Sequence, residues 1–341
     1  MTFEPLESRQ LLAATLVAGQ SVTTGIHTAG VQKNYFINLT KGQAFVIAAG
    51  DNGSTNYTSE VDLYAPNGRA IARSVSADGS FIGKVIPVTG QYRIRVRDVN
   101  NNGTASVTLT AFYTGGGTIT DSDDAGTMSS GRRFAASISP GDLDVWAIPA
   151  TKGAFINVVE NENDNGASIG AGILLVAPDG SGVKSAESEQ GVSVPITATQ
   201  TGTYYAIAYE PGANASGRYG ISVAVAPGTQ TTEDPDTQTP LKAGVTRTGD
   251  LPSGDQDVFQ VAIGRGDKVS FSAHRTSSTT TPAFTLVDPH GNVIASSTDA
   301  SNDSSTQISA TGTVSGIYYL VLLNGTTDTG GAYSLTYTRN A

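Results

Sequence analysis

One short pattern occurs three times along this chain and limits what the chain can fold into. An aromatic residue lies in a run rich in apolar residues and is followed seven positions later by a glycine. The aromatic residues are Tyr35, Trp146 and Phe259, and the glycines are Gly42, Gly153 and Gly266. An apolar run that ends at a glycine is typical of a strand entering a tight turn. Its repetition predicts a tandem array of similar domains.

Further landmarks keep the same order in each repeat. A proline two residues before a glycine predicts a turn ending at Gly68, Gly180 and Gly291, and a Gly-x-Tyr sequence opens an apolar strand at Tyr92, Tyr204 and Tyr318. A second Gly-x-Tyr sequence begins the last strand at Tyr219 and Tyr333, where we align Ala105 of the first repeat. Aligned landmarks of this kind predict that the three repeats share one topology.

The fold class follows from the spacing of the turns. No stretch shows sustained helical periodicity, whereas turn signals occur about every 8–12 residues. At 341 residues, the chain is long enough for about three domains of ordinary size. We therefore predict an all-β protein of three tandem jelly-roll-like β-sandwich domains. The predicted segments are an N-terminal targeting-like stretch (1–17), repeat 1 (18–114), repeat 2 (115–227), a Thr/Pro/acidic linker (228–237) and repeat 3 (238–341).

Composition excludes several classes of function. Twenty basic residues against thirty acidic ones give a formal net charge of −10, and no long basic run is present. Nucleic acid is therefore not an expected partner, because its binding depends on clustered positive charge. The absence of cysteine excludes a disulfide-stapled fold but leaves secretion open. The sequence contains no apolar run long enough for a transmembrane helix and does not predict the oligomeric state.

The first residues resemble a known export motif. Residues 3–14 resemble the N-terminal Leu-Glu-Pro-Arg-x-Leu-Leu motif of exported and surface proteins of planctomycetes, with serine in place of the proline. The matching residues are Phe3, Glu4, Leu6, Glu7, Arg9, Leu11, Leu12 and Ala13, and the substituted one is Ser8. This resemblance implies export to the cell surface, the periplasm or the extracellular medium.

The repeats themselves resemble the bacterial pre-peptidase C-terminal domain, a jelly-roll-like sandwich. The resemblance rests on Asp142-x-Asp144-Val-Trp and Asp255-x-Asp257-Val-Phe, together with the turn and the Gly-x-Tyr strands. The first repeat departs from it, since Lys33 stands at the second acidic position. The resemblance implies an accessory module of secreted proteins, often beside a protease or another hydrolase. Relatives in collagenases bind calcium and extracellular matrix.

Calcium is the metal that the acidic residues could hold. Asp142, Asp144, Asp255 and Asp257 alternate with other residues, so each pair is expected on one strand face. Ca²⁺ prefers carboxylate, carbonyl and amide oxygens, and further ligands could come from Asp121, Asp123 and Asp124. The alternative is that these carboxylates only discourage pairing at a sheet edge. Both interpretations stay open from the sequence.

Two other motifs are interpreted as turns. Residues 98–103 match the opening of a calcium loop, Asp-x-Asn-x-Asn-Gly, but Leu109 occupies the place of the closing glutamate. Arg265-Gly266-Asp267 resembles an adhesion tripeptide but lies at the turn glycine of the third repeat.

The residues that could support catalysis are scattered. The Gly-x-Ser-x-Gly sequence around Ser168 lacks the strand-to-helix context of a nucleophile elbow. Of the three histidines, His290 takes a turn position held by Asn67 and Asp179 in the other repeats, and His27 and His274 lie elsewhere. We therefore predict that the chain is not an enzyme.

The sequence predicts a non-catalytic, exported accessory or binding protein. Its partner would be an extracellular protein or a polysaccharide. The alternatives are a peptidase-associated hydrolase component and a structural envelope spacer. Arg93, Arg95 and Arg97 form a stripe on one strand, which is interpreted either as a solvent face or as an anion-binding face.

Overall fold

The computed structural model describes residues 15–51, 56–116, 125–162, 169–189, 191–231, 234, 236–237, 240–277, 281–297, 304–324 and 330–340. With 63% of these described residues in strands and no helix among them, it confirms the prediction of an all-β protein. In the described part of the chain, no helix has the length and apolarity needed to cross a membrane.

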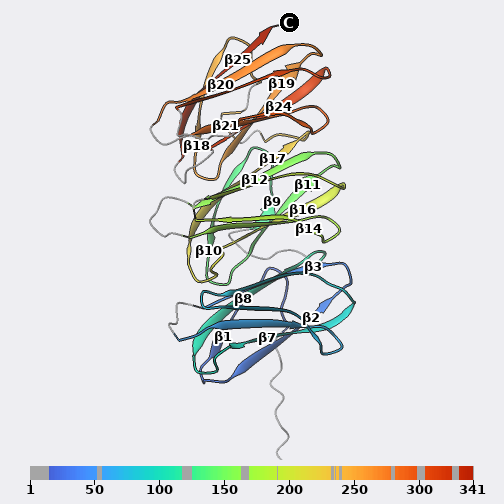
Figure 1. The fold of residues 1–341 in the computed structure, drawn as a ribbon, viewed down its shortest axis with the longest axis vertical. Helices are drawn as coiled ribbons and strands as arrows, with labels where there is room; N and C mark the ends of the chain where they lie inside the picture. Colours follow the sequence, from blue (N-terminus) through green and yellow to red (C-terminus); the bar gives the residue numbers. More distant parts are fainter. Residues whose placement is uncertain are drawn as a thin grey trace, which may run out of the picture.

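The strands form six sheets that are stacked in three pairs (Figure 1). The first pair contains β1 (Ser21–Ile26), β2 (Gln32–Leu39), β3 (Ala44–Asp51), β4 (Ser59–Tyr64), β5 (Ala70–Ser76), β6 (Ser80–Val85), β7 (Gly90–Asp98) and β8 (Ala105–Tyr113). The second contains β9 (Ala125–Thr127), β10 (Arg133–Ile138), β11 (Asp144–Ala150), β12 (Phe155–Glu162), β13 (Ala171–Val176), β14 (Gly182–Ser188), β15 (Gly191–Thr197), β16 (Gly202–Tyr209) and β17 (Gly217–Ala226). The third contains β18 (Thr246–Leu251), β19 (Gln256–Ile263), β20 (Lys268–Arg275), β21 (Pro282–Val287), β22 (Val293–Ser296), β23 (Ser305–Thr311), β24 (Gly316–Asn324) and β25 (Gly331–Asn340).

The three pairs share one topology, except that β9 adds a parallel edge strand to the second pair. The first has sheets of order β1-β8-β3-β6 and β2-β7-β4-β5. The second has β10-β17-β12-β15 and β14-β13-β16-β11-β9, and the third has β18-β25-β20-β23 and β19-β24-β21-β22. Each pair encloses its own hydrophobic cluster, so each is a β-sandwich with jelly-roll-like crossovers. We name them the first, second and third sandwich; that each folds separately within the predicted bounds stays a prediction.

The repeated aromatic residues occupy equivalent places. Each lies on the strand that pairs with the Gly-x-Tyr strand, and each faces the residue two positions after that tyrosine. The pairs are Tyr35 with Ile94, Trp146 with Ala206 and Phe259 with Leu320. All three aromatic side chains are buried in the core of their sandwich. The repeated sequence pattern therefore reflects the same strand pairing in the core of each sandwich.

The Gly-x-Tyr tyrosines fasten the turn that precedes their strand. The hydroxyls of Tyr92, Tyr204 and Tyr318 donate to a carbonyl four residues upstream, at 2.6, 3.2 and 2.9 Å. The rings are fully buried, so the hydroxyl needs such a partner at the core boundary. This contact resembles the tyrosine corner of other sandwiches.

The structure corrects the alignment of the last strand in the first sandwich. Tyr219 pairs with Ala136 and Tyr333 with Gly249, and the equivalent partner in the first sandwich, Thr24, pairs with Val107. Val107, rather than Ala105, therefore occupies the tyrosine position. The spacing agrees with this pairing, because Val107, Tyr219 and Tyr333 each lie 15 residues after the Gly-x-Tyr tyrosine of the preceding strand.

The first sandwich begins before the predicted boundary at residue 18. Thr15 forms a parallel bridge with Phe36, and Leu16 is 2% exposed within the core cluster. The residues that match the export motif lie outside the described residues.

Successive sandwiches stack through apolar sheet faces (Figure 1). In the first interface, the outer face of β3 and β8 meets the outer face of β11, β13 and β16, and the second interface joins the corresponding sheets. The buried side chains are Ala44, Val46, Ala48, Phe112, Leu143, Val145, Val176, Ile207 and Tyr209 in the first interface, and Phe155, Ala224, Ala226, Val258, Val287, Tyr319 and Val321 in the second. The same mode of packing is used twice.

Turn glycines allow this close approach. A Cβ added at Gly180 would overlap the carbonyl oxygen of Gly42, and one added at Gly291 would overlap that of Gly153. Both pairs join the Pro-x-Gly turn of one sandwich to the hairpin turn of the preceding one. Two interfaces with the same glycine contact indicate a regular stack.

Candidate metal centre

The third sandwich carries a buried carboxylate at the start of β19. Asp257 points inward like Phe259, because alternate residues of a strand share a face. Its side chain is fully buried, and the hydroxyl of Tyr333 on β25 donates a hydrogen bond to its Oδ2. Its Oδ1 is also buried, and no donor among the described residues reaches it. Such an oxygen is rare in folded proteins and marks a place where a proton, a water molecule or a cation can bind.

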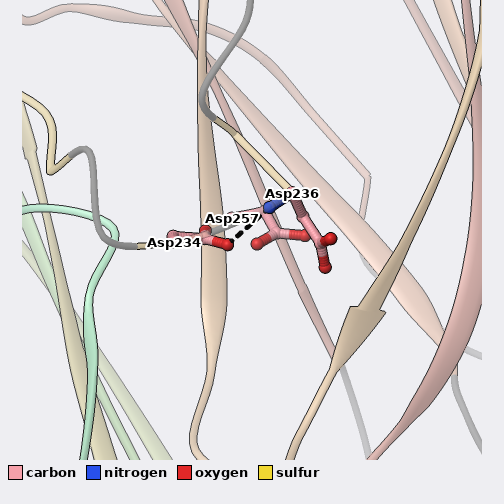
Figure 2. Close-up of side chains that lie close together, drawn as sticks. All are labelled: Asp234, Asp236 and Asp257. Carbon is pink, nitrogen blue, oxygen red and sulfur yellow. Dashed lines mark hydrogen bonds between the residues drawn. The ribbon is translucent and has the colours of Figure 1, made fainter.

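Two aspartates of the linker form a cluster with Asp257. One carboxylate oxygen each from Asp234, Asp236 and Asp257 lie within 4.8 Å of one another (Figure 2). The backbone N–H of Asp236 and the hydroxyl of Thr237 donate to Asp234 at 2.9 and 3.1 Å. The backbone N–H of Asp250 donates to Asp236 at 2.8 Å. The first two bonds lie within the linker, and the third ties Asp236 to β18.

Burial, with a further contribution from nearby negative charge, raises the pKa values of Asp255 and Asp257. Burial raises the pKa of Asp257 well above its ordinary range, and the carboxylates of Asp255 and Asp234 raise it further. Burial also raises the pKa of Asp255 to about 7, with a contribution from Asp234 that the N–H of Gln256 and the charge of Arg133 oppose. Asp255 and Asp257 therefore keep their protons to higher pH than ordinary aspartates unless a cation neutralises them.

The donor set fits a hard cation. Ca²⁺ takes about six to eight oxygen ligands from carboxylates, carbonyls and water in flexible geometry. Asp234, Asp236 and Asp257 would supply carboxylate oxygens, and the buried Oδ1 of Asp257 would gain the partner it lacks within the described structure. The arrangement can hold Ca²⁺ or share protons.

The outer members of the predicted pairs do not share a strand face with the inner ones. β11 begins at Asp144 and β19 at Gln256, so Asp142 and Asp255 precede the strands. Each outer carboxylate accepts a hydrogen bond from the backbone N–H of the next residue at 2.9 Å. This local turn ends the alternation on which the expectation rested.

Asp142 faces the first sandwich. Its Oδ1 accepts hydrogen bonds from the hydroxyl of Ser21 at 3.1 Å and from that of Thr110 at 3.4 Å. The structure thus places it at the first interface, away from the side chain of Asp144.

Asp144 is the counterpart of Asp257 in the second sandwich. It is fully buried, and the hydroxyl of Tyr219 donates to its Oδ2 at 2.5 Å. The indole N–H of Trp146 donates to the same hydroxyl at 3.2 Å. Glu160 of β12 is 3% exposed, and burial raises its pKa well above the ordinary range. The suggested further ligands Asp121, Asp123 and Asp124 lie outside the described residues.

The sequence-based prediction included Asp257 but missed its neighbours. Asp234 and Asp236 were interpreted only as part of a spacer, although an Asp-Pro-Asp sequence just before a sandwich is a signal for clustered carboxylates. Glu160 could not be predicted from the repeat pattern, because the equivalent positions in the first and third sandwiches are Ala49 and Ala273.

Residues 98–103 form a turn, as the sequence indicates. Asp98 is buried and accepts backbone hydrogen bonds from Thr58, Asn102 and Gly103 at 2.8 to 3.0 Å. Burial alone would raise the pKa of Asp98, but the donors led by Gly103 and Thr58 bring it below the ordinary value. Both oxygens are thus engaged by the backbone.

The adhesion-like tripeptide also lies in a turn. Gly266 has a φ of 88°, and Asp267 accepts a hydrogen bond from the N–H of Gly264 and an ion pair from Arg339 at 2.6 Å. The Asp267 side chain is largely buried, so its carboxylate stabilises the hairpin.

The histidines occupy three separate places. His27 follows β1, His274 lies on β20, and His290 lies in the turn before β22, 3.9 Å from Asp288. Ser168 lies outside the described residues.

The fold and the cluster together define an all-β protein of stacked sandwiches with a carboxylate centre beside a linker. No protein-family model matches the sequence, and no curated protein matches it. Among solved structures, the periplasmic g-type lysozyme inhibitor PliG of Aeromonas hydrophila is 18% identical, covers 29% of this chain and 96% of its own, and has a TM-score of 0.25. The pre-peptidase C-terminal domain of the Bacillus anthracis collagenase is 21% identical over 30% of this chain and 97% of its own, with a TM-score of 0.25. The tandem CBM51 modules of a Streptococcus pneumoniae family 98 glycoside hydrolase are 11% identical over 60% of this chain and 83% of their own, with a TM-score of 0.21. The family that the repeats resemble is thus represented among the structural neighbours.

Proposed function

We propose that this chain is an exported, non-catalytic accessory or binding protein whose third sandwich holds Ca²⁺ between the linker and β19. The observation that carries the calcium site is the buried Oδ1 of Asp257, which no described donor reaches, beside the carboxylates of Asp234 and Asp236. A cation there would satisfy the oxygen and offset the repulsion among the carboxylates.

The binding role is supported by the kind of chemistry that the site offers. Carboxylates with a buried tyrosine suit a hard cation, whereas acyl transfer needs a nucleophile beside a base. The proposed ligand is an extracellular protein or polysaccharide, and the proposed location is the cell surface, the periplasm or the medium. Export rests on the resemblance of residues 3–14 to the planctomycete motif.

Thermal unfolding of the full chain tests the calcium site. We expect Ca²⁺ to raise the melting temperature relative to a chelator, since free calcium at about 100 times its dissociation constant stabilises the native state by about 2.7 kcal/mol. Asp257→Asn should abolish this increase. In the chelator, the same variant should melt at or above the wild type, because asparagine replaces a buried carboxyl group whose charged form burial disfavours.

Asp250→Asn is the matched control, because it removes an exposed carboxylate of the same sandwich and leaves the cluster in place. Its calcium response should equal that of the wild type. Mg²⁺ should substitute poorly, because it requires a tighter octahedral site. Equal melting of the wild type with calcium and with chelator would remove the calcium part of the proposal.

A structural spacer is a second candidate. It is favoured by the two equivalent interfaces, each with an apolar cluster and a close glycine contact. A glycan or matrix array distinguishes the two roles, because it should retain a binding protein and should not retain a spacer.

A further inference from the structure

The first sandwich has a charged sheet face where the other two have apolar interfaces. The outward residues of β7 are arginines, and the outward residues of the equivalent strands β16 and β24 are apolar or aromatic. Counted from the Gly-x-Tyr tyrosine, the three sets are Arg93, Arg95 and Arg97; Tyr205, Ile207 and Tyr209; and Tyr319, Val321 and Leu323. The second and third sets pack against the preceding sandwich. The first lies on the sheet at the end of the stack (Figure 1).

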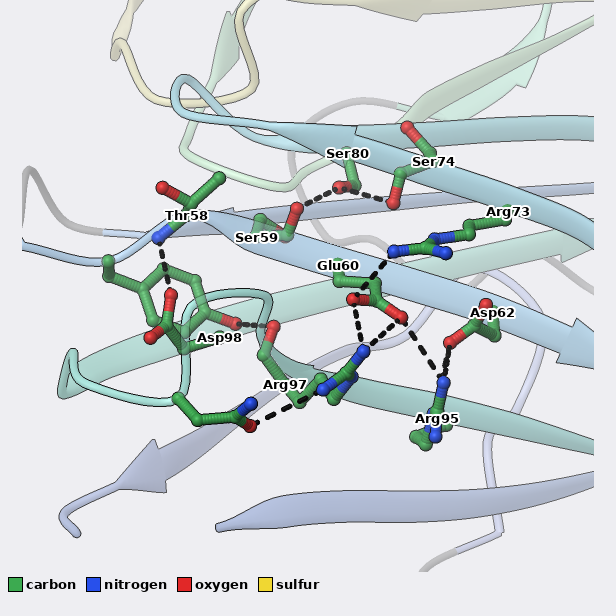
Figure 3. A network of polar contacts seen from close by, with 12 residues as sticks. Thr58, Ser59, Glu60, Asp62, Arg73, Ser74, Ser80, Arg95, Arg97 and Asp98 are labelled. Atoms are coloured by element: carbon green, nitrogen blue, oxygen red, sulfur yellow. Dashed lines mark hydrogen bonds and ion pairs between the residues drawn. The ribbon is translucent and has the colours of Figure 1, made fainter. Parts of the chain in front are cut away.

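A buried glutamate fixes three guanidinium groups on this face. Glu60 of β4 is 0% exposed, and its oxygens lie 3.1 Å from Arg73, 3.2 Å from Arg95 and 2.7 Å from Arg97 (Figure 3). Arg95 also pairs with Asp62 at 2.6 Å. The side chains of Arg95 and Arg97 remain 22% exposed and that of Arg73 remains 54% exposed. The face therefore presents partly exposed guanidinium groups whose positions are fixed by ion pairs.

Arg93 is held by neutral groups. Its guanidinium carbon lies 4.0 Å from the centroid of the Tyr64 ring, and its Nη1 donates to Asn34 Oδ1 at 3.1 Å. The aromatic ring orients the guanidinium without neutralising it, so its positive charge can be matched by an anion. Asn38 and Gln91, an exposed cross-strand pair, extend the same face with amide groups.

The local charge differs in sign from that of the whole chain. Four guanidinium groups meet two carboxylates on this face, while the formal net charge of the protein is −10. A small positive face on an acidic molecule favours a ligand with spaced anionic groups. A densely charged nucleic acid or membrane surface would repel the rest of the molecule.

We propose that the outer face of β2-β7-β4-β5 binds an anionic polysaccharide, with Arg93 and Arg73 taking carboxylate or sulfate groups and the neighbouring amides taking sugar hydroxyls. Arginine donates paired hydrogen bonds to planar carboxylates, and amides both donate to and accept from hydroxyls. This deepens the proposed binding role by naming its ligand class and rests on that role, but it does not depend on the calcium site.

Binding of the full chain to defined polyanions tests the proposal. The probes are polygalacturonate for carboxylate, dextran sulfate for sulfate, neutral dextran, and phosphatidylglycerol vesicles. A chelator in every sample separates this test from the calcium site. We expect retention on one or both polyanions at about 50 mM salt, decreasing as salt rises, and none on neutral dextran.

Variants that remove arginines and a variant that removes a carboxylate should change the binding affinity in opposite directions. Arg93→Gln combined with Arg73→Gln should weaken binding at least about tenfold. Asp62→Asn should tighten it about threefold by removing one of the two carboxylates that pair with Arg95. Arg132→Gln is the matched control, because this arginine also lies over an aromatic ring, 4.6 Å from the Phe134 centroid, but in the second sandwich. It should leave binding unchanged.

Three results would overturn the proposal. One is the absence of binding to both polyanions. Another is equal binding by the double variant and the wild type when both melt normally. The third is binding to the vesicles in place of the polysaccharides.

Discussion

A buried carboxylate that accepts from a buried tyrosine occurs in the second and third sandwiches. The pairs are Asp144 with Tyr219 and Asp257 with Tyr333. The first sandwich has neither partner, since Val107 fills the tyrosine position and Lys33 the carboxylate position. A buried hydroxyl needs an acceptor and a buried carboxylate needs a donor, so losing one member makes the other costly. The two residue types are present or absent together for this reason.

The raised pKa values predict an unusual pH dependence for the calcium-free protein. The pKa of Asp255 rises from 3.8 to about 7 on folding, and that of Asp257 is raised as well. Between these limits the native state binds more protons than the unfolded state, so stability falls as pH rises. We expect a loss of roughly 1 to 3 kcal/mol between about pH 4 and 7, measured by denaturant unfolding in a chelator.

Saturating calcium should reduce this pH dependence, because the ion replaces the protons. Asp257→Asn should reduce it also, without calcium. The pKa values of Asp98 and Asp288 are lowered on folding, so these two residues make stability rise with pH. Their effect is confined to more acidic solution, where protonation of their hydrogen-bonded carboxylates removes stability. A stability that rises steadily from pH 4 to 7 in the chelator would contradict the cluster.

The turn glycines differ in how closely the neighbouring sandwich packs against them. Gly291 and Gly266 have nearly the same φ, 89° and 88°, yet a Cβ at Gly291 would overlap the carbonyl of Gly153, and one at Gly266 would meet nothing within 4 Å. Gly266→Ala should therefore cost only the backbone strain, about 1 kcal/mol. Gly291→Ala should cost that strain plus about 1 to 3 kcal/mol from the strained interface.

Denaturant unfolding of the two full-length variants measures this difference. Limited proteolysis of the linker adds a readout that strain alone does not move, because only a disturbed second interface should speed cleavage. Equal destabilisation of both variants would show that the turn contact does not hold the sandwiches together.

The same elements show what the sequence could predict. The spacing from Tyr35, Trp146 and Phe259 to the turn glycines gave the strand register correctly, since core packing repeats with the strand period. Asp257 was predicted because it belongs to an acidic lead-in like that of the calcium-binding domains that the repeats resemble. Asp234 and Asp236 were missed because the linker reaches β19 only through tertiary folding. The fixed arginines were also beyond prediction, as Glu60 lies on another strand and becomes their partner only when β4 pairs with β7.

The whole molecule is a stack with apolar joints and polar ends. One end carries the arginines of β7, and the other is the sheet β18-β25-β20-β23, whose outward hydroxyls bond one another, as Ser309 does with Ser270 at 3.2 Å and Thr246 with Thr336 at 3.3 Å. The linker that joins the second sandwich to the third supplies two carboxylates to Asp257, so a cation there would bind to the joint as well as to the strand.

Titration calorimetry of Ca²⁺ into the full chain at neutral pH tests this account most directly. We expect a binding event that is accompanied by proton release and is lost in Asp257→Asn but kept in Asp250→Asn. Proton release is expected because burial and nearby carboxylates raise the pKa values of Asp255 and Asp257 in the absence of the ion. Absence of calcium binding, or binding that survives Asp257→Asn unchanged, would contradict it.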